Sequence, residues 1–145
     1  MVILMRVFYI FKIKEEFKYL YQDNPSQLYN LLKQIYFLGK DDINYGENIF
    51  NQLIEKIDKE SMDRKLFIKL HKEIPYSKRE NIHIMNNLYK DEISRLVIKN
   101  TYMKIETESS FSSFFNFLAQ LDENLFACDF SYIDFFFLDK IKTLV

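Results

Sequence analysis

Glycine and cysteine are scarce in this chain, and their scarcity excludes several kinds of chemistry. The 145 residues include two glycines, two prolines, one cysteine and no tryptophan. Loops that cradle phosphates need several closely spaced glycines so that the backbone can approach the ligand. Because Gly39 and Gly46 are the two glycines, a P-loop, a dinucleotide-binding fingerprint and a nucleophile elbow are excluded.

The single cysteine, Cys128, rules out an intrachain disulfide and favours a reducing compartment. It stands in an apolar strand pattern, where a free thiol is usually a small buried hydrophobe rather than a nucleophile. The apolar start of the chain is interrupted by Arg6 and lacks the basic region and cleavage site of a signal peptide. No apolar run reaches the roughly 18 residues of a membrane helix. We therefore expect a soluble, cytoplasmic protein.

An excess of positive charge is also missing. The chain has 20 basic and 21 acidic residues and a net charge of −1, whereas nucleic-acid-binding domains normally carry a basic excess. The stretch 64–72 is locally basic, with Leu66, Phe67 and Leu70 between its charges. We interpret it as a half-buried strand with a solvated lysine face; a nucleic-acid-binding strand is the alternative. We expect no direct contact with nucleic acid.

Strand and helix patterns follow one another along a single domain that spans residues 1–145. Alternating or continuous apolar patterns predict strands at 7–13, 65–71, 93–98, 102–108, 125–130 and 133–138. Helical spacing predicts helices at 14–21, from Asn24 to Gly39, at 44–59, within 79–89, and from a Ser109 or Ser110 cap to Leu121. The first strand is apolar on both faces, as in the middle of a sheet. The pattern indicates an α/β fold with a mixed central β-sheet and helices on its faces, in a three-layer α/β/α-like arrangement.

Residues with catalytic or metal-binding chemistry are few and scattered. His71 and His83 have no further ligand at the spacing of a metal site, so we expect no metal and no cofactor. Asp129 stands in an apolar run, where a raised pKa could suit it to acid–base work with one of the histidines. A small enzyme built on this pair is one hypothesis. The other is a carboxylate at the sheet edge or bonded to backbone donors.

The predicted first helix carries an aromatic pair. Phe17 and Tyr21 are four residues apart and share a helical face, with Leu20 beside them. This face either packs on the sheet or anchors a partner protein, because binding hot spots favour aromatic side chains within a polar rim. The polar rim would be Lys14, Glu16 and Lys18.

Motifs at both ends of the chain resemble one known family. Residues 8–17 read Phe-Tyr-Ile-Phe-Lys-Ile-Lys-Glu-Glu-Phe, and Tyr21 follows four positions after the last Phe. Near the other end stand Phe114-Phe115-x-x-Leu118, then Leu125-Phe126-Ala127-Cys128-Asp129-Phe130, and a closing aromatic strand at 135–138. In order and spacing these motifs resemble the sporulation inhibitor of replication family, SirA. The chain lacks the Gly-Trp pair of that family's closing strand.

The resemblance implies an inhibitor of replication initiation in low-GC Gram-positive bacteria. Such a protein binds domain I of the initiator DnaA and has no enzymatic activity. The first helix belongs to the family's contact surface, which places Phe17 and Tyr21, with Lys14 and Lys18, at the partner. The family's N-terminal spacing also suggests that translation begins at Met5 rather than Met1.

Overall fold

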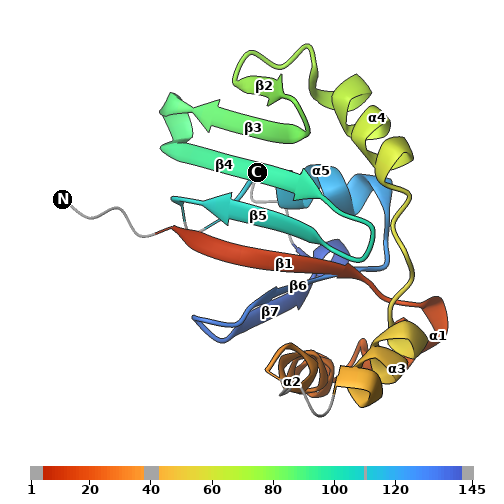
Figure 1. The fold of residues 1–145 in the computed structure, drawn as a ribbon. Coiled ribbons are helices and arrows are strands. Elements are labelled where there is room, and N and C mark those ends of the chain that lie inside the picture. Colours follow the sequence, from red (N-terminus) through yellow and green to blue (C-terminus); the bar gives the residue numbers. More distant parts are fainter. Residues whose placement is uncertain (1–4, 38–42, 110, 142–145) are drawn as a thin grey trace.

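The computed structural model describes residues 5–37, 43–109 and 111–141 (Figure 1). Within these ranges the strands are β1 Arg6–Lys12, β2 Tyr76–Arg79, β3 Ile82–Asn87, β4 Glu92–Ile98, β5 Met103–Thr107, β6 Leu125–Asp129 and β7 Asp134–Phe137. The helices are α1 Glu15–Tyr21, α2 Pro25–Tyr36, α3 Ile43–Leu53, α4 Lys59–Leu70 and α5 Phe114–Leu121, with short 3₁₀ turns η2 Leu88–Lys90 and η3 Leu138–Lys140. The α/β class is confirmed.

The described strands form one sheet in the order β2-β3-β4-β5-β1-β6-β7. Every pairing in it is antiparallel, so neighbouring strands run in opposite directions throughout and the sheet is not mixed as expected. The first strand has the interior position that its apolar faces predicted, because Phe8 pairs with Ile105 of β5 and Ile10 pairs with Ala127 of β6. The sequence did not predict the antiparallel pairing, because an apolar pattern does not show whether a strand pairs parallel or antiparallel to its neighbour.

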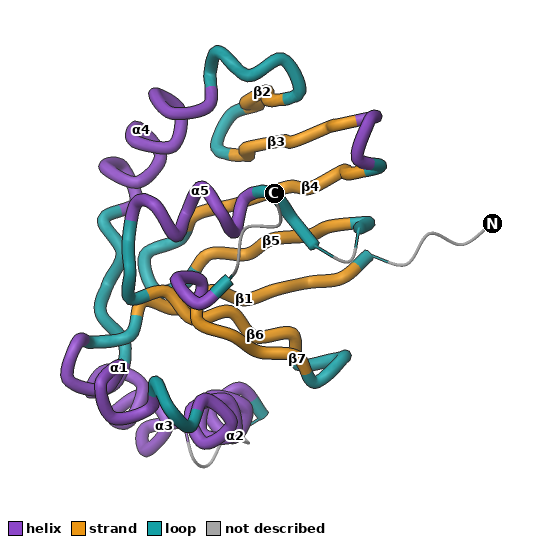
Figure 2. The backbone as a smooth tube through the Cα atoms, turned by 180° about the vertical axis from the view of Figure 1, so that it is seen from behind, coloured by secondary structure: helices purple, strands orange, loops and turns teal. Residues whose placement is uncertain are grey.

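Helices pack on both faces of the sheet. Phe8 and Ile10 point to one face and belong to a core cluster that includes α4 and α5, and α5 lies across the face seen in Figure 2. Phe11 and Ile13 point to the other face and belong to a second core cluster with α2 and α3. β1 is therefore buried on both sides, which explains its continuous apolar sequence.

The second helical layer covers only part of its face. Its buried residues come from β1, β6 and β7 on the sheet side and from α2 and α3 on the helix side. Over β3 and β4, the side chains that point to the same face are half-buried or exposed, such as Ile84, Arg95 and Val97. Helices therefore cover this second face at β1, β6 and β7 but leave it open over β3 and β4, so the expected three-layer arrangement is only partly present.

Residues 64–70 of the basic stretch lie on α4, so the predicted strand at 65–71 is wrong. Asp58 caps this helix by accepting a 3.2 Å hydrogen bond from the Ser61 amide. Four-residue spacing places its buried side chains in one row, Met62, Leu66 and Leu70. The basic side chains lie on its exposed face, as the solvated interpretation predicted.

The polar segment predicted to hold a short helix at 79–89 is instead the β2–β3 hairpin. Glu80 takes a left-handed backbone (φ 57°) at the turn, and His83 and Met85 alternate inward along β3. The Tyr76 hydroxyl is 2.8 Å from His83 Nδ1, and His83 Nε2 is 2.7 Å from Asp63 of α4. This chain of polar contacts fastens the hairpin to the helix.

The other predicted helices are confirmed with shifted ends. The predicted helix at 44–59 is α3 as far as Leu53, but residues 54–58 are not helical and α4 begins at Lys59. The predicted stop Gly39, the cap candidate Ser110 and residues 1–4 before Met5 lie outside the described residues. α5 begins later than expected, because the buried Glu92 carboxylate accepts hydrogen bonds from the Ser113 amide and hydroxyl, both at 3.0 Å. In the described ranges no helix has the length and apolar character to cross a bilayer.

Candidate partner-binding site

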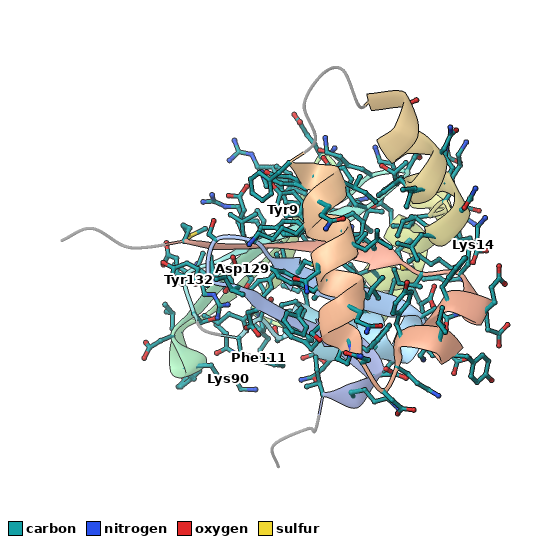
Figure 3. The ribbon with its side chains drawn as sticks, turned by 90° about the horizontal axis from the view of Figure 1, so that it is seen from below. Tyr9, Lys14, Lys90, Phe111, Asp129 and Tyr132 are labelled. Atoms are coloured by element: carbon teal, nitrogen blue, oxygen red, sulfur yellow. The ribbon has the colours of Figure 1, made fainter. Side chains whose placement is uncertain are left out.

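Two backbone hydrogen bonds from the residues just before α1 hold the start of this helix in place. The Ile13 amide donates to the Asn124 carbonyl in the loop before β6 at 2.9 Å. The Lys14 amide donates to the Leu53 carbonyl at the end of α3 at 3.0 Å. α1 follows β1 along the chain and lies beyond the end of that strand, beside α2 and α3 (Figures 1 and 2). Lys14 lies at the edge of the molecule where β1 leads into α1 (Figure 3).

The aromatic pair of α1 lies between the core and the surface. Phe17 and Tyr21 are half-buried and pack against the second core cluster. Leu20 lies three residues after Phe17 and therefore next to it on the helix surface, and 65% of it is exposed. Tyr19, on a different side of the helix, is 68% exposed. The face predicted from the sequence thus combines two half-buried rings with one exposed leucine.

Lys18 is bound within the protein. Its ammonium donates to Asp139 Oδ2 of η3 at 2.6 Å and to the Glu123 carbonyl, and its side chain is only 12% exposed. These contacts tie the middle of α1 to two segments near the C-terminus. Glu15 and Glu16 on the first turn are exposed, and acidic groups there suit the positive end of the helix dipole.

Asp129 has a complete set of structural partners. Its Oδ2 accepts from Arg6 Nε at 3.0 Å, and its Oδ1 accepts from the amides of Ser131 and Tyr132 at 3.0 and 3.1 Å. The residue is 1% exposed and lies beside Tyr132 in Figure 3. Arg6 also donates to Asp134 at 3.0 Å. These bonds hold the β6–β7 turn against the start of β1, as the backbone-donor hypothesis predicted.

Neither histidine meets Asp129, so the predicted acid–base pair is wrong. His83 is on β3, four strand steps from β6 in the sheet, which is about 19 Å at the usual strand spacing. His71 ends α4, where its Nδ1 lies 3.1 Å from the Phe67 carbonyl. No cluster of three metal-ligating side chains occurs among the described residues. Cys128, beside Asp129 on β6, is fully buried, as the sequence predicted.

Two parts of the α1 surface escaped prediction from the sequence. The exposure of Tyr19 depends on which side of the helix meets α2 and the sheet. The partner of Lys18 is Asp139, which is 121 positions away in the sequence. A third aromatic residue in the predicted helix was the one signal for Tyr19, and no local pattern points to Asp139.

Comparison with known proteins agrees with the motifs at the two ends of the chain. The family model described as sporulation inhibitor of replication protein SirA matches residues 6–142. The match includes the middle of the chain, from which no motif was quoted for the resemblance. A comparison with curated proteins found no match. Because the family model covers nearly the whole chain, the protein belongs to the SirA family of sporulation inhibitors of replication.

Proposed function

We propose that this protein binds domain I of the initiator DnaA through α1 and thereby keeps it from acting at the replication origin. Its family inhibits the initiation of replication. The proposal adds two assignments, DnaA domain I as the partner and α1 as the helix that contacts it. The observation that carries them is the apolar stripe of Phe17, Leu20 and Tyr21, which continues from the second core cluster onto the surface. The action is non-enzymatic, needs no cofactor and takes place in the cytoplasm.

Each predicted site residue has a distinct part in this proposal. Phe17 and Tyr21 are the anchors, since aromatic side chains with one end packed and one end exposed lose little conformational entropy on binding. Lys14 supplies a rim charge. Lys18 is a positioning residue, because its bonds to Asp139 and Glu123 orient the helix.

Half-burial of the anchors has a consequence for binding. The rings are held by the core before a partner arrives, so association does not have to order them. Truncating an anchor of this kind typically costs about 2 kcal/mol of binding free energy or more, which is about a 30-fold increase in Kd.

Calorimetric titration of the purified protein with DnaA domain I tests the proposal. We expect a complex whose Kd rises about 30-fold in Tyr21→Ala and further in the Phe17→Ala, Tyr21→Ala double variant. Leu20→Ala is the sharper variant, because the exposed leucine adds little to stability and its loss should weaken binding without weakening the fold.

Tyr89→Ala is the matched control, since this tyrosine is fully exposed on η2, at the far end of the β3–β4 hairpin. Its Kd should equal that of the wild type. Circular dichroism and thermal unfolding must show that the α1 variants are folded, because truncation of a half-buried ring also removes packing. Absence of a complex, or a Kd unchanged in the double variant, would refute the proposal.

A further inference from the structure

An aromatic cavity of about 310 Å³ lies between α2, α3 and the sheet. It is on the face of the sheet that carries the second core cluster, and no residue of α1 lines it. Its walls come from separate parts of the chain. β1 supplies Tyr9 and Phe11, α2 supplies Leu32, Ile35 and Tyr36, α3 supplies Phe50, and the β4–β5 turn supplies Thr101 and Tyr102. Tyr36 is half exposed at its rim, so the cavity reaches the solvent there.

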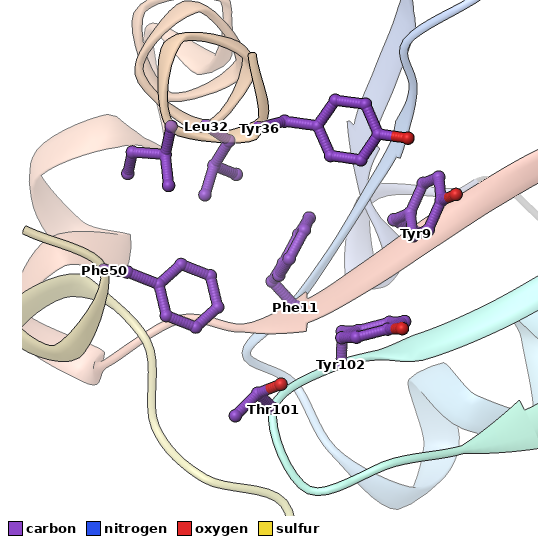
Figure 4. Close-up of a pocket in the computed structure, with 8 residues that line it drawn as sticks. Tyr9, Phe11, Leu32, Tyr36, Phe50, Thr101 and Tyr102 are labelled. Atoms are coloured by element: carbon purple, nitrogen blue, oxygen red, sulfur yellow. The ribbon is translucent and has the colours of Figure 1, made fainter. Parts of the chain in front are cut away.

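The two ends of the cavity differ in chemistry. Phe50 and Leu32 form an apolar end, and the hydroxyls of Tyr9, Tyr36 and Tyr102 gather on the opposite side (Figure 4). Phe11 stands between the two, 5.9 Å from the Phe50 ring and 6.4 Å from the Tyr102 ring. A hydrogen bond to Tyr36, together with burial, raises the pKa of Tyr9 to about 12. The Tyr9 hydroxyl is therefore a neutral hydrogen-bonding group at physiological pH.

The size and the lining restrict the class of ligand. An engineered cavity of roughly 150 Å³ holds one benzene ring, so this cavity has room for about two fused rings with a substituent. Among the described residues, the lining carries no charged side chain, and burying a charge without a partner is costly. Aromatic walls favour flat ligands that stack or meet the rings edge to face.

We propose that this cavity binds a neutral, flat small molecule of about two fused aromatic rings that carries one hydrogen-bonding edge. The rings lie against Phe11 and Phe50, and the polar edge meets the tyrosine hydroxyls. The site is independent of α1, so the ligand and the partner protein occupy different surfaces.

Titration of the ¹⁵N-labelled protein with indole, followed by NMR, tests the site. We expect saturable shifts of the amide signals of Tyr9, Thr101 and Tyr102, with a Kd of roughly 0.1–1 mM for a ligand of about nine heavy atoms. Ile35→Trp places a ring in the cavity and should abolish these shifts. Gln34→Trp puts the same residue on the exposed side of the same helix and should leave them unchanged.

Tetramethylammonium ion is the second probe, because a cage of aromatic rings can also hold a cation. Saturation by this ion and not by indole would overturn the proposal in favour of a cation site. Absence of saturable shifts with indole, or shifts that map away from the cavity, would also overturn it. The wild-type titration therefore decides the question even if Ile35→Trp does not fold.

Discussion

Replacing tyrosine by phenylalanine should have opposite effects on the free energy of unfolding at two buried positions. Tyr29 of α2 is 2% exposed, with its ring stacked 4.7 Å from Phe135 and 5.7 Å from Phe130. Among the described residues its buried hydroxyl finds no hydrogen-bond partner. Tyr76 of β2 is 8% exposed, and its hydroxyl is 2.8 Å from Nδ1 of the fully buried His83.

The magnitudes follow from the state of each hydroxyl. An unsatisfied buried polar group costs about 1–3 kcal/mol. Tyr29→Phe removes such a group and keeps the stacked ring, so the free energy of unfolding should rise by about 1 kcal/mol. Tyr76→Phe leaves His83 Nδ1 without its partner, so the free energy of unfolding should fall by about 1–3 kcal/mol. For a domain of this size each kcal/mol shifts Tm by about 2–4 °C.

Urea unfolding followed by circular dichroism measures both variants against the wild type. The two substitutions remove the same atom from the same residue type, so each is the control for the other. An equal m-value in all three proteins would show that the comparison concerns stability alone. If Tyr29→Phe lowers the free energy of unfolding as much as Tyr76→Phe, the Tyr29 hydroxyl has a bond in solution and the reasoning fails.

Three further predictions concern groups held inside the fold. Burial lowers the pKa of His83 below its ordinary value of 6.5, so at low pH the unfolded chain binds a proton that the folded protein does not. The contribution to the free energy of unfolding is therefore full above pH 6.5 and falls as the pH drops below it. Urea unfolding of His83→Gln should lack this pH dependence. Burial raises the pKa of the Cys128 thiol, so Ellman's reagent should label the folded protein only as fast as it unfolds, and rapid labelling would contradict this burial. Lys18→Met should speed amide hydrogen exchange in α1 but not in β1, because it removes the bond to Asp139; equal exchange in both proteins would show that α1 does not need this bond.

The sequence predicted an element correctly where the residues that determine it are close together in the chain. β1 was predictable because the apolar residues of both its faces all lie within residues 7–13. α4 was not, because the window 65–71 reads as alternation, and its buried row becomes visible only when Met62 is included. β3 was hidden because one of its inward residues is a histidine whose acceptor, Asp63, lies 20 positions earlier on a different element.

The same distinction applies to the candidate site. Helical spacing alone placed Phe17 and Tyr21 on one face, since four residues make about one turn. Whether that face is covered depends on the packing of α1 against the second core cluster, which local pattern does not contain. The chemistry assigned to Asp129 failed for a related reason, because the sheet order separates β6 from β3 and supplies Arg6 and two turn amides in its place.

The shortness of α1 ties its surface to the whole fold. A seven-residue helix is far below the roughly 12–15 residues at which an isolated helix becomes even marginally stable in water. It persists because Ile13 and Lys14, just before it, are bonded to the loop before β6 and to the end of α3, and because Lys18 at its middle is bonded to η3. Those bonds join α3, the loop before β6 and the C-terminal turn to one short helix. A partner that binds α1 therefore meets a surface already ordered by the sheet, and substitutions in any of these three segments should weaken binding without touching the partner.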